Sequence, residues 1–155
     1  MNLTFLYCDY ANEYHCNSLA ELINQYIVDP MGGGKPLTPL EQLRLVDGMA
    51  LHPSGFVLFA VLDEKIVGLA TCFINFSTFK TRPFLNIHDL IVRKDYRGRG
   101  IGRSIMVKCN AIAYDRKYCK VTLEVRRDNL IAQSLYKNLG FKDSEPVMHY
   151  WTIEL

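Results

Sequence analysis

The sequence contains no apolar run long enough to span a bilayer, since a membrane helix needs about 20 consecutive apolar residues. Its first residues, MNLTFLYCDY, lack the basic region and the cleavage site of a secretory signal peptide. The two absences together predict a cytoplasmic protein that has no membrane partner.

The chain also has little net charge and no paired cysteine spacing. A formal charge of +2 over 155 residues argues against a general nucleic-acid-binding protein, whose basic excess would extend over a wider surface. The five cysteines are odd in number and lack Cys-x-x-Cys spacing. His15-Cys16 has no nearby second pair to complete four ligands, so we expect free structural thiols and no metal.

What the sequence does contain is enough apolar residues for one core. A chain of 155 residues with 49% hydrophobic and 22% charged residues is typical of an ordinary globular domain. We therefore predict a single domain that spans residues 1–155.

Periodicity and turn signals predict mixed α and β structure. Thr38-Pro39-Leu40-Glu41 is a capping box with proline at the first helical position, and Gly140 follows a helix as a C-terminal cap. The expected elements are a strand at 3–8, a helix that ends before residue 29, a helix from 38 to about 51, a hairpin of 56–62 and 66–76, a buried strand at 85–92, a helix from about 100 to 117, a strand at 120–125, a helix at 130–139 and a last strand at 147–154.

Residues 85–102, LNIHDLIVRKDYRGRGIG, join an apolar strand to a basic, glycine-rich turn. The glycines at 98, 100 and 102 permit positive φ and let backbone N–H groups approach a ligand closely. A helix is expected to begin here, so its positive N-terminal end points to the same place. The basic residues of the turn are Arg93, Lys94, Arg97, Arg99 and Arg103. We therefore predict an anion-binding cradle.

The glycine pattern narrows the choice of anion. A P-loop requires GxxxxGK followed by Ser or Thr, and the residues after Gly98 do not supply it. A Rossmann fingerprint is GxGxxG, whereas residues 98–102 read GxGxG. Neither nucleotide-binding motif fits the turn.

Residues 97–102 instead resemble the pyrophosphate-binding loop of the GNAT acetyltransferase family, written (Arg/Gln)-x-x-Gly-x-(Gly/Ala), with Arg97, Gly100 and Gly102 in the fixed places. A second segment, EVRRDNLIAQSLYKNLGF, is similar to the family's later strand, asparagine and helix. Its matching residues are Asn129, Ala132, Tyr136, Gly140 and Phe141. On these two motifs the chain is identified as a member of the family.

The resemblance implies an α/β fold with a mixed, mostly antiparallel sheet of six to seven strands and about four helices. In this fold the fourth and fifth strands run parallel and splay apart, and the pantetheine arm of acetyl-CoA enters the gap. The arm is an amide chain, so it would pair with the backbone of Leu90, Ile91 and Val92 as an added strand does. We therefore expect acetyl-CoA as co-substrate.

The same resemblance assigns the other cofactor contacts. Backbone N–H groups of the turn would hold the pyrophosphate, with Arg97 and Arg103 adding charge, while Arg99 fits a solvated side chain better. Asn129 would bind the cofactor arm, cap the following helix, or do both. The residues expected at the cofactor are Leu90, Ile91, Val92, Arg97, Gly98, Arg99, Gly100, Ile101, Gly102, Arg103, Asn129 and Tyr136.

Acetyl transfer to an amine requires a proton acceptor for the amine and a proton for the departing thiolate. In this family the tyrosine at the place of Tyr136 points its hydroxyl at the coenzyme sulfur, which implies a general acid. Spacing alone would instead make Tyr136 a core aromatic on the face of Ala132, Leu135 and Leu139. A backbone N–H near Ile91 would polarise the thioester carbonyl.

His88-Asp89 stands where polyamine acetyltransferases of the family carry Glu-Asp. A histidine has an ordinary pKa near 6.5, so it can accept the amine proton close to neutral pH. The alternative is a hydrogen-bonded core histidine, and the residues alone leave both open. In a regular strand Asp89 would face the side opposite to His88. We take Tyr136, His88 and Asp89 as the candidate catalytic residues.

The function expected from the resemblance is transfer of acetyl from acetyl-CoA to a primary amine of a small molecule, such as an amine, a polyamine or an amino-acid-like acceptor. The alternatives are a protein or peptide N-acetyltransferase and a CoA-binding sensor without turnover. We expect no nucleic-acid partner, and a homodimer is left open. Residues 31–35, with three successive glycines, are either a plain linker or a lid over the acceptor site.

Overall fold

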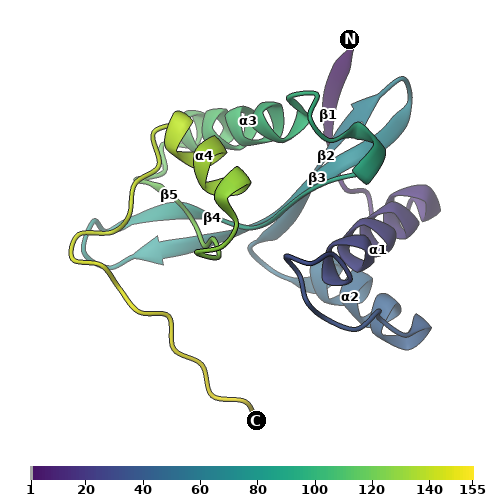
Figure 1. The fold of residues 1–155 in the computed structure, drawn as a ribbon, viewed down its shortest axis with the longest axis horizontal. Coiled ribbons are helices and arrows are strands. Elements are labelled where there is room, and N and C mark those ends of the chain that lie inside the picture. Colours follow the sequence, from purple (N-terminus) through teal and green to yellow (C-terminus); the bar gives the residue numbers. More distant parts are fainter. Residues whose placement is uncertain (1) are drawn as a thin grey trace. The chain divides into compact units, whose positions relative to one another are not determined.

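The computed structural model describes residues 2–155, which divide into two compact units, one up to Glu124 and one of Val125–Leu155. The first unit holds a five-stranded sheet with helices on both faces (Figure 1). The second unit holds one helix and the C-terminal segment.

The sheet of the first unit has the order β1-β2-β3-β4-β5, with antiparallel neighbours except for the parallel pair β4 and β5. This confirms the α/β class and the parallel fourth and fifth strands. The expectation of six to seven strands was wrong, since residues 2–155 form five. The elements are β1 (Leu3–Tyr7), α1 (Glu13–Ile27), α2 (Pro39–Leu51), β2 (Gly55–Leu62), β3 (Lys65–Ser77), β4 (Arg82–Val92), the short 3₁₀ helix η1 (Lys94–Tyr96), α3 (Ile101–Asp115) and β5 (Val121–Leu123).

Local signals set several of these boundaries. The Glu41 N–H donates to Thr38 Oγ1 at 3.3 Å and the Thr38 N–H donates to Glu41 Oε2 at 2.7 Å, so the capping box that begins α2 is confirmed. The β2–β3 hairpin turns at Asp63 and Glu64, whose φ angles are 48° and 61°. Two-residue hairpin turns with positive φ at both positions match the twist of the flanking strands, which explains the tight connection.

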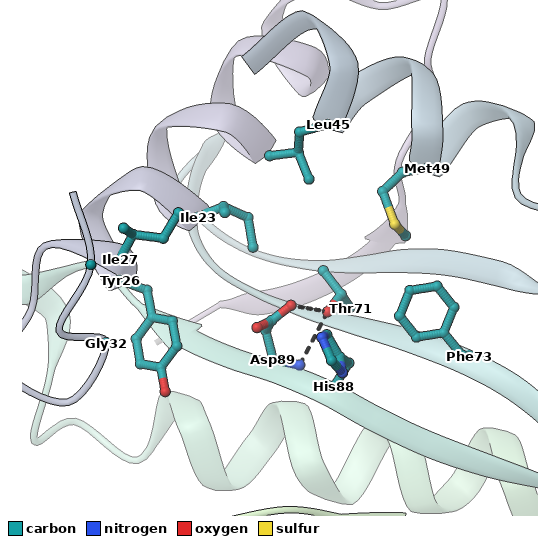
Figure 2. A pocket seen from close by; sticks show the side chains of 11 residues that line it. Ile23, Tyr26, Ile27, Gly32, Leu45, Met49, Thr71, Phe73, His88 and Asp89 are labelled. Carbon is teal, nitrogen blue, oxygen red and sulfur yellow. Dashed lines mark hydrogen bonds between the residues drawn. The ribbon is translucent and has the colours of Figure 1, made fainter. Parts of the chain in front are cut away.

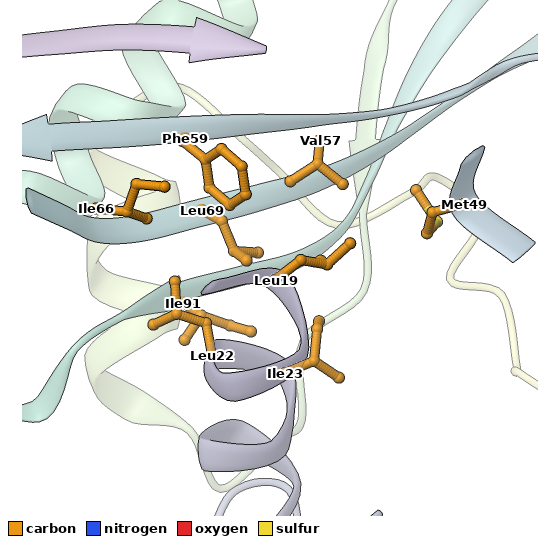
Figure 3. Close-up of a cluster of buried hydrophobic side chains, with 9 residues drawn as sticks. All are labelled: Leu19, Leu22, Ile23, Met49, Val57, Phe59, Ile66, Leu69 and Ile91. Carbon is orange, nitrogen blue, oxygen red and sulfur yellow. The ribbon is translucent and has the colours of Figure 1, made fainter. Parts of the chain in front are cut away.

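The core on one face of the sheet lies under α1 (Figure 3). Side chains of α1 pack onto the middle strands, and each such buried side chain contributes roughly 1.5–3 kcal/mol to stability. The cluster consists of Leu19, Leu22, Ile23, Met49, Val57, Phe59, Ile66, Leu69 and Ile91. This packing fixes α1 and α2 above one face of β2, β3 and β4.

Helix α3 covers the opposite face of the sheet (Figure 1). Its residues Ile101, Ile105, Met106 and Cys109 are buried, at the helical repeat expected for a stripe that faces a sheet. Cys109 Sγ lies 4.0 Å from Cys72 Sγ of β3. The five cysteines are free thiols, two of them buried and three partly buried.

The second unit contains α4 (Leu130–Asn138), close to the helix expected at 130–139. The Ala132 N–H donates to Asn129 Oδ1 at 3.1 Å, so Asn129 caps this helix. Gly140, with a φ of 89°, follows its end as expected.

The strand expected at 147–154 was wrong, because these residues pair with no strand in residues 2–155. Val147, Trp151 and Ile153 would share one face of an extended chain, but a shared face does not supply hydrogen-bond partners for the backbone. Trp151 is accordingly 85% exposed. In the same range, no helix is both long and apolar enough to cross a membrane.

Candidate active site

The parallel pair opens after three residues. β5 pairs with β4 only from Leu85 opposite Val121 to Ile87 opposite Leu123. β4 then continues to Val92, and within residues 2–155 no strand pairs with that side of it. β4 therefore offers an open backbone edge over its last five residues.

Hydrogen bonding to β3 decides which backbone groups face this edge. The Arg93 N–H donates to Val67 O at 2.8 Å, and Val92 lies opposite Gly68. In an antiparallel ladder this makes Val92 a residue whose own N–H and C=O point away from β3, and the same holds two residues earlier for Leu90. The N–H and C=O of Ile91 point toward β3 instead. An added chain can therefore pair with Leu90 and with the Val92 N–H, whereas Val92 O already accepts from Arg97 Nε at 3.0 Å. The oxyanion donor expected near Ile91 would be the N–H of Leu90 or that of Val92.

A β-bulge reorients the centre of β4. Thr71 of β3 lies opposite Asp89 and Cys72 lies opposite Ile87, which leaves His88 as an extra residue. His88 and Asp89 consequently line the same cavity, on the face covered by α1 and α2 (Figure 2). The expectation that Asp89 would face the opposite side was wrong, because it assumed a regular strand.

Asp89 is held by a buried hydroxyl. Thr71, which is 2% exposed, donates its hydroxyl hydrogen to Asp89 Oδ2 and accepts a hydrogen bond of 3.1 Å from the Asp89 N–H (Figure 2). A side chain that is tied to its neighbour in this way loses little further freedom when a ligand binds. The carboxylate is thus preorganised at the wall of the cavity.

His88 is exposed, which does not fit a core histidine. Its ring stands edge-on to Phe73, with ring centroids 5.6 Å apart and planes at 77°. His52 packs against the same Phe73 ring at 4.8 Å but does not line the cavity. His88 is thus oriented by an aromatic contact while its polar atoms stay accessible.

The cavity has a volume of about 460 Å³ and is mostly apolar. Among the residues of 2–155 that line the cavity, Asp89 is the one acidic residue and none is lysine or arginine. The glycine segment that was either a linker or a lid forms part of the wall, through Gly32 and Gly34. The lining residues are Ile23, Tyr26, Ile27, Gly32, Gly34, Leu45, Met49, Thr71, Phe73, His88 and Asp89.

The turn between β4 and α3 has the geometry expected of an anion cradle. Gly98 and Gly100 have φ angles of 75° and 78°, and a Cβ on either would meet nothing within 4 Å. α3 begins at Ile101, and the first four N–H groups of any helix have no partner within it. Open space and unpaired donors therefore coincide at this turn, as anion binding requires.

Two arginines of the turn, Arg97 and Arg99, are held by contacts within the protein. Arg97 donates from Nη1 to Asp29 Oδ2 at 2.9 Å and from Nε to Val92 O at 3.0 Å. The Arg99 guanidinium lies 5.2 Å from the centroid of the Tyr96 ring and donates to a backbone oxygen. Arg103, on the first turn of α3, lines a second cavity of about 310 Å³. Arg97 thus forms an ion pair with Asp29. Its contribution to phosphate binding stays a prediction.

Tyr136 and Asn129 belong to the second unit. The Tyr136 ring contacts Phe141, with centroids 6.0 Å apart and planes at 58°. The Tyr136 ring is half-buried, which fits the alternative of a packing role for this residue. Asn129 caps α4, as the structural alternative for it predicts. Their roles toward acetyl-CoA stay predictions.

Sequence reasoning missed the residues that shape the cavity. Thr71 is a polar residue inside an apolar strand, which was a signal for a specific partner. The helix residues Ile23, Leu45 and Met49 carried no such signal, because their periodicity is equally that of core positions.

Comparison with known proteins agrees with this geometry. The sequence profile described as "Acetyltransferase (GNAT) family" matches residues 9–141. Thialysine N-epsilon-acetyltransferase from Bos taurus is 36% identical over 149 residues, which cover 91% of this chain and 86% of that protein. N-alpha-acetyltransferase MAK3 from Arabidopsis thaliana is 27% identical over 145 residues, covering 94% of this chain and 70% of that protein.

A solved structure supports the fold. Ribosomal-protein-alanine N-acetyltransferase from Brucella melitensis has a TM-score of 0.81 at 16% identity, covering 99% of both chains. Identity at this level shows the fold alone, whereas the profile match extends over most of the sequence. This chain belongs to the Acetyltransferase (GNAT) family and is an acyltransferase.

Proposed function

We propose that this protein transfers the acetyl group of acetyl-CoA to the primary amine of a small-molecule acceptor. The observation that carries the proposal is the β4 bulge, which brings His88 and Asp89 to one cavity beside the open edge of the same strand. A proton acceptor, a carboxylate and a site for an extended amide chain are thereby supplied by five consecutive residues.

The chain's own groups fit acetyl-CoA in two places. The backbone of Leu90 and Val92 would pair with the pantetheine arm, and the N–H groups around Gly98 to Arg103 would hold the pyrophosphate. Acetyl-CoA supplies the activated acyl thioester. A hydrogen bond from the Leu90 N–H would stabilise negative charge on the thioester oxygen.

The proton balance assigns the side chains. An alkyl ammonium has a pKa of about 10.4, so a proton must be removed before the nitrogen attacks the carbonyl. We assign this step to His88. The nitrogen would form the C–N bond, the C–S bond would break, and the departing sulfur would take a proton from Tyr136. The second proton of the nitrogen would leave as the amide forms and restore the Tyr136 phenol, so one proton remains on His88. Asp89 would attract the cationic acceptor into the cavity.

The cavity favours a cationic acceptor with an apolar body. Among the described lining residues the one acidic side chain is Asp89, and the walls from α1 and α2 are aliphatic except for Tyr26. The relative from Bos taurus is named for a small amine, which supports this acceptor class, while the Arabidopsis thaliana relative is named for N-alpha acetylation. A peptide is therefore the alternative acceptor that the experiment must distinguish from a small amine.

The test is release of free thiol from acetyl-CoA in the presence of lysine-like amines, diamines, polyamines and short peptides with free N-termini. We expect kcat/KM for the best small amine to exceed that for any peptide by about tenfold, which corresponds to about 1.4 kcal/mol in the transition state. A preference for peptides would reverse the acceptor assignment. Acetyl-CoA binding without thiol release for any amine would indicate a sensor.

His88→Gln should lower kcat/KM at neutral pH by about 10²-fold, the lower end of general base catalysis. If His88 accepts the proton, the variant should also lose the fall in rate that the wild type shows toward acidic pH. Higher pH should partly rescue it, because more acceptor is then neutral. The measurement is kcat/KM across the pH range.

The control is His52→Gln. His52 contacts the same Phe73 ring but lies outside the cavity lining. Its replacement should therefore leave the acidic limb of the pH–rate profile unchanged. An unchanged profile in His88→Gln, with lower thermal stability, would show that His88 has only a structural role.

A further inference from the structure

The glycine segment after α1 has a defined conformation at the cavity wall. The N–H groups of Gly32 and Gly33 donate to Asp29 O at 2.8 and 2.9 Å, and the Gly34 N–H donates to Ile27 O at 2.8 Å. Figure 2 shows Gly32 beside Tyr26 and Ile27. The segment is therefore folded back on the last turn of α1.

Close packing makes this wall sensitive to small shifts. A Cβ on Gly32 would lie 2.0 Å from Tyr26 O and 2.7 Å from Ile27 O, and a Cβ on Gly34 would lie 2.7 Å from Ile27 Cγ2. Backbone oxygens leave no room for a Cβ at position 32, so glycine is required there, whereas a Cβ at position 34 would displace the Ile27 side chain. The position of the wall in turn sets the width of the cavity.

One carboxylate joins this wall to the turn after β4. Asp29 Oδ1 accepts from the Met31 N–H at 3.1 Å, and Asp29 Oδ2 accepts from Arg97 Nη1 at 2.9 Å. Arg97 is itself fixed to the end of β4 through Val92 O. The Asp29 side chain is 19% exposed and that of Arg97 is 43% exposed, so the pair is partly shielded from solvent. The contact links the acceptor cavity to the loop assigned to the pyrophosphate.

We propose that Asp29 and Arg97 position the glycine wall of the acceptor cavity. Asp29 is thus a positioning residue for the acceptor, and the Arg97 side chain acts on this wall instead of on phosphate. This inference rests on the proposed function, since it assigns the cavity to the acceptor. Charge keeps the pair intact at neutral pH, because the hydrogen bond from the Met31 N–H and then that from Arg97 hold the pKa of Asp29 below its ordinary value.

The fold contains a matched control. Arg93 donates from Nη1 and Nη2 to the two carboxylate oxygens of Glu21 at 2.5 and 2.8 Å. This pair also joins α1 to the end of β4, but Glu21 and Arg93 are absent from the cavity lining. Glu21→Gln therefore removes an ion pair of the same kind without touching the glycine wall.

Asp29→Asn should raise the KM for the acceptor about tenfold, while kcat and the KM for acetyl-CoA change less than about twofold, because lost ground-state binding raises KM alone. Arg97→Gln should have the same effect, and the double variant should be no worse than either single one. Glu21→Gln should leave all constants near wild type. An unchanged acceptor KM in Asp29→Asn, or a higher KM for acetyl-CoA in Arg97→Gln, would overturn the proposal.

Hydrogen exchange in the ligand-free protein separates this inference from the proposed function. The amides of Met31, Gly32 and Gly33 should exchange faster in Asp29→Asn than in wild type, and at the wild-type rate in Glu21→Gln. Unchanged exchange in Asp29→Asn would refute the link whatever the activity. Faster exchange together with no acetyl transfer by the wild type would refute the proposed function and leave the link standing.

Discussion

Tyr136→Phe should lower kcat by about 10²–10⁴-fold, the usual contribution of a general acid, with acetyl-CoA affinity nearly unchanged. The phenylalanine ring keeps the contact that Tyr136 makes with Phe141, so only the hydroxyl is lost. The free energy of unfolding should fall by less than about 1.5 kcal/mol, the net value of one hydrogen bond. Steady-state kcat at saturating acetyl-CoA and acceptor measures the effect.

The comparison variant is Tyr114→Phe. Tyr114 lies on α3 and is 84% exposed, so loss of its hydroxyl should change neither kcat nor stability. If Tyr136→Phe turns over near the wild-type rate with saturating substrates, water protonates the departing thiolate. The catalytic role of Tyr136 would then be withdrawn, while membership of the family would stand.

The parts of the fold that the sequence predicted correctly are set by local interactions. The capping box at Thr38 and Glu41 closes within four residues, and the hairpin turn at Asp63 and Glu64 joins adjacent strands. The glycine turn before α3 likewise follows from one short segment. Such features depend on short-range sterics and hydrogen bonds, so residue types at fixed spacing are sufficient to identify them.

The bulge at His88 could not be predicted in the same way. It exists because β3 and β4 shift register between Thr71 and Cys72, and the residues that pair across this step are about 18 positions apart in the chain. A regular alternation therefore placed Asp89 on the wrong face. The prediction of a last strand was wrong for a related reason, since Val147, Trp151 and Ile153 would share a face but residues 147–154 have no partner strand in residues 2–155.

The candidate site was predictable only where a motif described it. The cradle and the His88-Asp89 pair were located by pattern, whereas Thr71 and the wall from Gly32 to Gly34 became part of the site through packing. Arg97 shows the same limit. The motif identified Arg97 at the turn, and only the fold shows that its side chain reaches Asp29 of a distant segment.

Gly100→Asp should reduce acetyl-CoA affinity by about 10³-fold and leave the domain folded. A carboxylate about 4 Å from a phosphate group, near a protein surface, costs about 4 kcal/mol per pair of unit charges. The fold should tolerate the change, because a Cβ here meets nothing within 4 Å. The φ of 78° strains any residue other than glycine, but aspartate and asparagine accept this region better than most, at a cost of about 1–2 kcal/mol.

Gly100→Asn distinguishes the effect of negative charge from that of side-chain volume. Asparagine has nearly the same shape and tolerance of positive φ as aspartate but carries no charge. Calorimetric titration of both variants with acetyl-CoA, after circular dichroism has confirmed folding, should rank wild type above Gly100→Asn and Gly100→Asn well above Gly100→Asp. Equal losses in the two variants would mean that the side chain blocks the turn and that charge contributes little. Wild-type affinity in Gly100→Asp would mean that the pyrophosphate binds elsewhere. A carboxylate at residue 100 would repel a pyrophosphate bound by the N–H groups at the start of α3.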